Sequence, residues 1–310
     1  MIQAPVVLGL DFGGTKIAAA VCRLDGTRLG SATVGSGGEL GARASFDRGV
    51  ATARNLLAST APGVPLAAVG VSTFGIPFDD RVELAPAISG WGELPLGREL
   101  RAAFPGSVVR MATDAKAAAA AEVRWGALAD CDPAIYLNLG TGLAVAIVAN
   151  GAVVAGSHGA AGEIGYNLRH LTDVGQLLDD RLPLEGAVSG MALTRAARNV
   201  FPTAESAAAV FERAADNPWV ARLVTDFIAE LSYHLVNLAI AVDPARIVVG
   251  GGMVRSWDQL YGGLREALDA AVPFPPDLVR ADFPFDAPLM GALALGLAAA
   301  REVRGEEVSA

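Results

Sequence analysis

The first of three short glycine-containing segments carries residue types that bind phosphate groups. In this segment, Asp11 ends an apolar run and is followed by Gly13, Gly14, Thr15 and Lys16. Because glycine has no Cβ, backbone N–H groups in such a turn can approach phosphate oxygens closely. The Asp11 carboxylate could hold a magnesium ion, in part through water, since Mg²⁺ keeps much of its hydration. The same turn also fits a plain β-hairpin.

A second and a third glycine segment favour a nucleotide. One lies between two apolar runs, as the first turn does, and the other joins an apolar run to a predicted helix. They consist of Gly140, Thr141 and Gly142, and of Gly250, Gly251 and Gly252. The third suits a flat adenine ring lying against backbone, although by itself it also fits a tight strand–helix connection. The three glycine segments in this order indicate a bound nucleotide, with its phosphates at the first two segments and its base at the third.

Asp114 stands where a predicted strand (107–112) meets an alanine-rich predicted helix (115–127). A carboxylate at a strand end can orient an attacking hydroxyl group and accept its proton, and phosphoryl transfer needs little more from a side chain. The helix N-terminus would favour the ionised form of the carboxyl group. The residue equally fits a simple N-cap of the helix.

The elements that must position these residues form two similar α/β units. Each is predicted to begin with a three-stranded meander, from apolar runs at 6–10, 17–22 and 29–34, and at 134–139, 143–149 and 152–155. Helices are predicted over 45–59 with Ser45 as N-cap, over 218–242 and over 287–300. We predict an α/β fold with a duplicated β-turn-β-turn-β unit. Residues 1–115 plus 287–310 would form one domain and residues 116–286 the other, around an interdomain cleft.

Composition excludes several classes of protein. A net charge of −9 argues against a nucleic-acid partner, which requires a basic face. The long uncharged stretch that begins at residue 134 is broken by turn residues, and the first ten residues lack a basic region, so we expect no membrane span, no signal peptide and a cytoplasmic location. Two cysteines and three scattered histidines show no disulfide or metal-ligand spacing.

These motifs resemble the ROK group (repressors, open reading frames and sugar kinases) of the actin/hexokinase-like ATPase superfamily, over nearly the whole chain. The resemblance rests on residues 11–16 and 140–142 as phosphate motifs, Asp114, the sugar signature at 161–165, Leu184-Glu185, the adenosine element at 237–253 and the terminal helix at 291–294. It implies a two-domain, actin-like ATPase (ribonuclease H-like) fold.

The resemblance also implies an activity and a set of roles. ATP with Mg²⁺ would donate a phosphoryl group to a primary hydroxyl of a hexose-type acceptor, and the protein would form a homodimer. Asp114 would be the catalytic base, and Glu163 and Glu185 would accept hydrogen bonds from sugar hydroxyls, although both also fit ordinary surface acids. Gly75, Thr113 and Tyr166 would complete the substrate site.

The chain departs from the family at the substrate site. Tyr166 replaces a histidine that in many members reads the sugar and binds zinc, and residues 169–183 contain no cysteine, so we expect no zinc. We expect Leu177, Leu178 and Leu182 to pin this segment instead. Lys116 stands where the family has asparagine, and it fits either a substrate or phosphate contact or an exposed lysine in the first turn of a helix.

Retained phosphoryl-transfer residues beside altered acceptor residues predict a kinase whose acceptor is not plain glucose. An amino sugar, another hexose or a sugar-like cyclitol would fit. The alternatives are a catalytically weak sugar-binding or sensor protein of the same fold, a polyphosphate-dependent glucokinase, and a chaperone-like ATPase. A family repressor is not expected, because ten residues precede Asp11.

Overall fold

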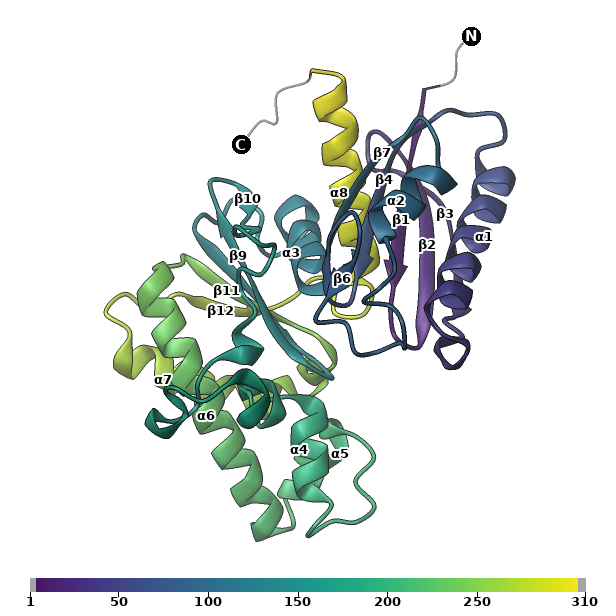
Figure 1. Ribbon diagram of the computed structural model, residues 1–310. Helices are drawn as coiled ribbons and strands as arrows, with labels where there is room; N and C mark the ends of the chain where they lie inside the picture. The colour runs from purple at the N-terminus through teal and green to yellow at the C-terminus, as the bar shows by residue number, and fades with distance from the viewer. Residues whose placement is uncertain (1–3, 306–310) are drawn as a thin grey trace. The chain divides into compact units, whose positions relative to one another are not determined.

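The computed structural model describes residues 4–305 and divides into two compact units (Figure 1). Unit 1 contains the described residues up to Trp125, the segment Ala155–Ala160, and the described residues from Asp286 onward. Unit 2 contains Gly126–Val154 and Ala161–Phe285. The sequence pattern put a boundary after residue 115. In the structure the whole of helix α3 (Asp114–Trp125) belongs to unit 1, where it packs along α8 (Ala287–Val303).

The two units contain sheets of the same strand order, which confirms the duplicated β-turn-β-turn-β unit. The order is β3-β2-β1-β4-β7 in unit 1 and β10-β9-β8-β11-β12 in unit 2. In both sheets the first three strands are antiparallel, and the last two are added in parallel. The strands of the five-stranded sheet in unit 1 are β1 (Val6–Phe12), β2 (Lys16–Arg23), β3 (Arg28–Gly35), β4 (Leu66–Thr73) and β7 (Val108–Thr113). Those of unit 2 are β8 (Ala134–Leu139), β9 (Leu143–Ala149), β10 (Ala152–Val153), β11 (Arg246–Gly250) and β12 (Asp277–Arg280).

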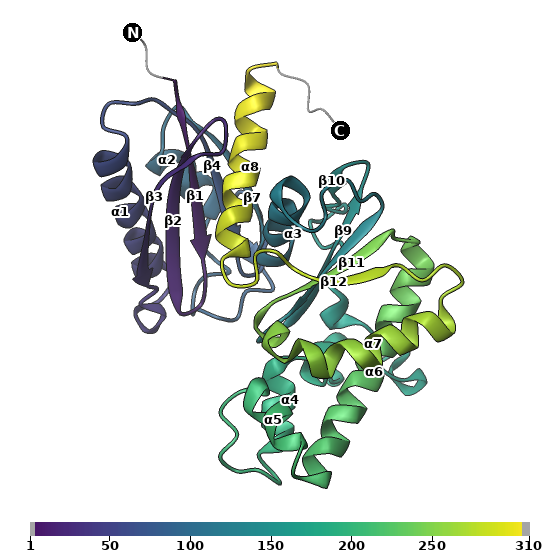
Figure 2. The same cartoon turned by 180° about the vertical axis from the view of Figure 1, so that it is seen from behind.

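Helices cover both faces of the sheet in unit 1. Helices α1 (Ala42–Thr60) and α2 (Leu96–Ala103) lie on one face, and α8 lies on the other, as both views show (Figures 1 and 2). Side chains of a strand alternate between faces, so Leu8 and Leu10 join the core under α1 while Val7 joins the core under α8. The same alternation puts Asp11 on the α8 face.

Glycines allow α8 to lie unusually close to this sheet. A Cβ added to Gly70 of β4 would lie 1.8 Å from the carbonyl oxygen of Ala292 in α8. One added to Gly291 of α8 would lie 1.7 Å from the carbonyl oxygen of Ala117 in α3. The small antiparallel pair β5 (Ile76–Pro77) and β6 (Val82–Glu83) completes unit 1.

In unit 2, the face of the sheet that carries Ile135, Leu137 and Leu139 is packed against helices. These are α4 (Gly190–Ala197), α5 (Ala207–Ala214), α6 (Pro218–Val242) and α7 (Trp257–Ala271). Helix α6 lies between α5 and α7 in the packing, with contacts to both. It supplies Phe227 and Leu231 to the core.

Helix α6 is also the one described helix that is long and apolar enough to cross a membrane. Its most apolar window has a mean hydropathy of 1.2, and 39% of that window is buried inside the structure. A core helix passes the same test, so this finding is weak evidence for a span.

Helix α1 begins at Ala42, so the expectation that Ser45 is its N-cap was wrong. Gly41 precedes the helix, and the buried Ser45 lies in the first turn, where its N–H donates to the Gly41 carbonyl at 3.1 Å. Ala42 and Ala44 are strong helix formers, and they extend the helix upstream of the serine.

Candidate active site

Three parallel strands of unit 1 end at the same edge of the sheet. Phe12, Thr73 and Thr113 are the last residues of β1, β4 and β7, and they lie in register. Ligands of open α/β sheets bind outside the carboxyl ends of the strands. Asp11 stands one residue before the end of β1 and Asp114 one residue after the end of β7, so both carboxylates lie at this edge.

Asp11 is half-buried, and its environment perturbs its titration. Burial is the main cause that raises the pKa of Asp11, and the negative charge of Asp114 also raises it. A hydrogen bond from the Ser72 hydroxyl to Oδ1, at 2.9 Å, and the charge of Lys16 lower it, and the net result is a pKa of about 6. The carboxylates of Asp11 and Asp114 therefore repel each other, and a cation bound beside them would reduce this repulsion.

Two successive carbonyls of the first glycine turn accept hydrogen bonds from one serine, and this fixes the direction of the N–H groups that follow them. The carbonyls of Gly14 and Thr15 both accept hydrogen bonds from Ser36, from its hydroxyl at 2.7 Å and from its N–H at 3.0 Å. In a trans peptide the N–H points opposite to the carbonyl. The N–H groups of Thr15 and Lys16 consequently point away from Ser36. The turn is closed by the Gly13 N–H, which donates to the Lys16 carbonyl at 3.0 Å.

Asp114 is the first residue of α3 and lies at its N-terminus. Its Oδ1 accepts the N–H of Ala115 at 2.7 Å, and the hydroxyl of the buried Thr113 lies 3.5 Å from the N–H of Lys116. The side chain of Lys116 is buried, with 5% exposure, which removes the alternative of an exposed first-turn lysine. Gly75 forms the turn after β4, where its φ of 76° and the adjoining Glu83 carbonyl favour glycine.

The second glycine turn, in unit 2, repeats the arrangement of the first. The carbonyls of Gly140 and Thr141 accept the N–H groups of Gly190 and Met191 in the first turn of α4, at 2.8 and 3.3 Å. By the same peptide geometry, the N–H groups of Thr141 and Gly142 point away from α4. In both turns, two successive carbonyls accept hydrogen bonds, and the two N–H groups of the same peptide units point away from the donors.

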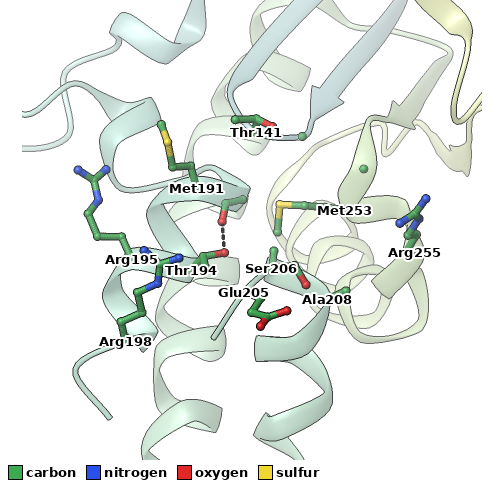
Figure 3. Close-up of a pocket in the computed structure, with 14 residues that line it drawn as sticks. Thr141, Met191, Thr194, Arg195, Arg198, Glu205, Ser206, Ala208, Met253 and Arg255 are labelled. Atoms are coloured by element: carbon green, nitrogen blue, oxygen red, sulfur yellow. Dashed lines mark hydrogen bonds between the residues drawn. The ribbon is translucent and has the colours of Figure 1, made fainter. Parts of the chain in front are cut away.

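A pocket of about 570 Å³ opens beside the second turn (Figure 3). It lies at the carboxyl ends of β8 and β11, which are parallel neighbours. Figure 3 shows Arg195 and Arg198 on one side of this pocket and Arg255 on the other. Its lining consists of Gly140, Thr141, Gly190, Met191, Thr194, Arg195, Arg198, Glu205, Ser206, Ala207, Ala208, Gly252, Met253 and Arg255. Its size and its mixed apolar and cationic lining suit a nucleotide.

The three glycines at the end of β11 have different surroundings. Gly252 lines the pocket, with no heavy atom within 4 Å of an added Cβ. Gly250 is packed on the Tyr136 hydroxyl, and Gly251 has a φ of 86° with the Leu139 carbonyl oxygen 2.5 Å from an added Cβ. The first two shape the turn, and the third faces the cavity.

Glu163, Tyr166 and Glu185 form a half-buried acidic cluster in unit 2. Burial raises the pKa of the Tyr166 hydroxyl, and the charges of Glu185 and Glu163 raise the pKa further. Oε2 of Glu185 accepts the N–H of Leu143 at 2.8 Å, directly after the second glycine turn. A Cβ added to Gly142 would lie 2.4 Å from the same oxygen, so glycine leaves room for the carboxylate.

The sugar signature is held on β9 by its first glycine. The N–H of Val145 donates to the Gly162 carbonyl at 2.9 Å, and a Cβ on Gly162, whose φ is 84°, would lie 1.9 Å from the Val145 carbonyl oxygen. This close approach fixes the backbone immediately before Glu163.

The segment after Tyr166 is not pinned by leucines, so that expectation was wrong. Leu177, Leu178 and Leu182 are 72%, 44% and 53% exposed. Polar contacts hold the segment instead, between Arg169 and Glu230 of α6 and between Arg181 and the carbonyls of Tyr166 and Asn167. Among residues 4–305 we find no group of three or more histidine, cysteine, aspartate or glutamate side chains arranged to hold a metal ion.

Several pocket residues were not singled out by the sequence pattern. Arg195 lies in α4 and Arg198 is the C-cap of this helix, and their spacing of three positions puts both on one helix face. Glu205 and Arg255 come from other segments and had no signal of their own. Ser72, the partner of Asp11, had none either, because cross-strand neighbours cannot be read from one strand.

The sequence profile of the ROK family matches residues 7–299, and this chain belongs to that family. The first curated relatives include the bifunctional enzyme NanE/NanK of Brucella melitensis, 31% identical over 295 residues. That alignment covers 92% of this chain, which spans about half (52%) of the relative's length. The kanosamine kinase of Amycolatopsis mediterranei is 30% identical over 316 residues, covering 96% of this chain and 99% of the relative.

Solved structures agree with this assignment. The ROK hexokinase of Thermus thermophilus is 31% identical, with a TM-score of 0.80 over 97% of this chain and 99% of that chain. A ROK family glucokinase of Streptomyces griseus, in complex with glucose and AMPPNP, is 28% identical, with a TM-score of 0.74 over 94% of this chain and 99% of that chain. The resemblance to the ROK group and the two-domain actin-like fold are confirmed.

Proposed function

We propose that this protein is an ATP- and magnesium-dependent kinase that transfers the γ-phosphoryl group to a hydroxyl of a hexose, an amino sugar or a sugar-like cyclitol. The observation that carries the proposal is the pairing of Asp11 and Asp114 at the carboxyl ends of β1 and β7, close enough for the charge of one to raise the pKa of the other. The names of the relatives support a sugar kinase.

Asp114 is the base in this proposal. It accepts the proton of the acceptor hydroxyl while that oxygen bonds to the γ-phosphorus, and the bond from phosphorus to the β-phosphate oxygen breaks to release ADP. Glu163 and Glu185 accept hydrogen bonds from the acceptor hydroxyls, with Tyr166 beside them. The outward N–H groups of Thr15 and Thr141, with their neighbours in each turn, bind phosphate oxygens.

The donor set at Asp11 fits Mg²⁺. A half-buried carboxylate beside a hydroxyl and a second carboxylate offers the oxygen ligands that Mg²⁺ prefers, with room for retained water. When bound, Mg²⁺ neutralises charge on the phosphates of the nucleotide. Asp11 would hold it, and the pocket beside Gly252 would hold adenosine.

The test is acceptor-dependent release of ADP from ATP over a panel of hexoses, amino sugars and cyclitols, with Asp114→Ala alongside. We expect turnover on at least one acceptor and a loss of roughly 10²–10⁴-fold in Asp114→Ala. The matched control, Asp47→Ala, removes an exposed aspartate of α1 in the same unit and should turn over like the wild type. Wild-type turnover in Asp114→Ala would reject Asp114 as the base, and ATP binding without any turnover would favour the sensor alternative.

One observation favours polyphosphate as a second candidate donor. Arg195, Arg198 and Arg255 come together at the pocket, although the sequence shows no basic run. The same assay with polyphosphate in place of ATP decides between the donors.

We also propose that the protein works in the cytoplasm as a homodimer and without zinc. The family resemblance supports the dimer, and the lack of cysteine in residues 169–183 supports the absence of zinc. Stoichiometric zinc in a metal analysis, or a monomeric mass in solution, would contradict these points.

A further inference from the structure

The segment that follows Tyr166 is not held by burial of its apolar side chains. Residues 167–183 run from Tyr166 to the short 3-10 helix at Leu184–Gly186, which carries Glu185. Within the segment, Leu171 is 93% exposed and Leu177 is 72% exposed. The hydrophobic effect therefore contributes little to its conformation.

Ionic contacts attach the start of this segment to α6. Arg169 forms two hydrogen bonds with the carboxylate of Glu230, through Nε and, at 3.0 Å, through Nη2. The two side chains are only 17% and 26% exposed, so water screens the pair less than it would on an open surface. Asp173 accepts the N–H groups of Arg169 and His170, each at 2.9 Å, and this closes the first turn of the segment.

Arg181 attaches the far end of the segment back to its beginning. Its Nη2 donates to the carbonyl of Tyr166 at 2.6 Å, and its Nη1 donates to the carbonyl of Asn167 at 3.1 Å. The planar guanidinium group matches two successive carbonyls as a rigid fork, which a lysine ammonium group cannot do. The contact closes a loop of chain on the backbone of Tyr166.

This contact acts on a residue of the acidic cluster. The Tyr166 hydroxyl lies near enough to Glu163 and Glu185 for both charges to perturb it, and Glu185 follows Arg181 by four residues. Release of the carbonyls of Tyr166 and Asn167 would loosen the chain that follows the tyrosine, because the N–H groups of Tyr166 and Asn167 hold only the turn before it. The side chains that face the acceptor would then have to be ordered each time that the acceptor binds.

We propose that Arg181 is a positioning residue for the acceptor, which it serves by holding the backbone of Tyr166 and Asn167. The inference rests on the proposed kinase function, since it assigns Arg181 to the acceptor side of that site. Arg181 contacts the protein backbone and acts on the acceptor through Tyr166. It should therefore affect the acceptor KM and leave the KM for ATP unchanged.

The kinetic experiment compares Arg181→Ala and Arg181→Lys with a matched control. Loss of two charge-assisted hydrogen bonds should raise the acceptor KM about tenfold in Arg181→Ala, with kcat and the KM for ATP within about twofold of wild type. The acceptor KM of Arg181→Lys should lie between those of wild type and Arg181→Ala, because an ammonium group can donate a well-directed hydrogen bond to one of the two carbonyls but not to both. The control, Arg222→Ala, removes a 75% exposed arginine that pairs with Asp226 on α6, and it should match wild type. An unchanged acceptor KM in Arg181→Ala overturns the proposal.

A second readout separates this inference from the kinase proposal. Amide hydrogen exchange of peptides spanning residues 164–182 should be faster in Arg181→Ala than in wild type or Arg222→Ala, with the rest of unit 2 unchanged. If wild type turns over no acceptor, the kinase proposal fails, and exchange still tests whether Arg181 holds the segment. Unchanged exchange in Arg181→Ala shows that it does not, and overturns the inference whatever the activity.

Discussion

Replacement of Asp11 by asparagine should make the unliganded protein more stable at neutral pH. The carboxyl group has an ordinary pKa of 3.8, and burial raises the pKa to about 6 in the folded protein. At about 1.4 kcal/mol for each pH unit, the ionised form costs the folded state roughly 2–3 kcal/mol. Asparagine keeps the oxygen that accepts the Ser72 hydroxyl and removes the charge, so Asp11→Asn should recover about this amount.

The sign of the pH dependence follows from the direction of the shift. Well below pH 3.8, Asp11 is protonated in the folded and the unfolded chain, and wild type loses nothing. Between about pH 4 and 6 the unfolded chain ionises while the folded carboxyl group stays largely protonated, so wild type loses stability until the folded group ionises as well. The stability advantage of Asp11→Asn should therefore be small at pH 4 and complete above pH 7.

The assay is urea denaturation followed by tryptophan fluorescence, at pH 4, 6 and 8 with EDTA present to remove cations. Trp91 is fully buried in unit 1, and its indole N–H donates to the Thr73 hydroxyl at the same sheet edge, at 3.1 Å. Asp47→Asn, on the exposed surface of α1, should stay within about 0.5 kcal/mol of wild type at each pH. Equal stability of Asp11→Asn and wild type at pH 8, or an advantage at pH 4 as large as that at pH 8, would refute the reasoning.

Substitutions at three glycines give further tests. Gly70→Ala would put a Cβ 1.8 Å from the Ala292 carbonyl oxygen, so unfolding free energy should fall by about 3 kcal/mol or more, whereas Gly262→Ala in α7, with nothing within 4 Å, should gain up to about 1 kcal/mol. Thermal unfolding measures both, and similar melting temperatures would contradict the close packing of α8. Gly142→Ala would displace the Glu185 carboxylate, which lies 2.4 Å from the added Cβ. The acceptor KM should rise about tenfold with little change in melting temperature, and an unchanged KM would exclude Glu185 from acceptor binding.

Local patterns were enough to predict the duplicated β-turn-β-turn-β unit and the order of the motifs. Alternating apolar runs and glycine turns are short-range signals, so the two meanders could be read directly from the chain, whereas the last parallel strand, β12, was not predicted. Asp114 was likewise recognisable from its place between a strand and a helix. These features depend on residues within a few positions of each other, which is the range over which propensity and periodicity act.

Pairings between distant residues could not be read from the sequence. Asp11 acquires its raised pKa from burial and from Asp114, about one hundred positions away, and its hydroxyl partner Ser72 comes from a neighbouring strand. The pocket gathers arginines from α4 and from the turn after β11. Such contacts are set by strand register and helix packing, which a single sequence does not display.

The segment after Tyr166 shows the difference most clearly. Its leucines predicted that the segment is anchored by apolar packing. In the structure Leu171 and Leu177 are exposed and are not packed in the core of unit 2. The sequence by itself determined which charged residues the segment carries. Only the tertiary structure decided that Arg181 meets the carbonyls of Tyr166 and Asn167 and that Arg169 meets Glu230 of α6, because a charged side chain takes the partner that folding brings within its reach.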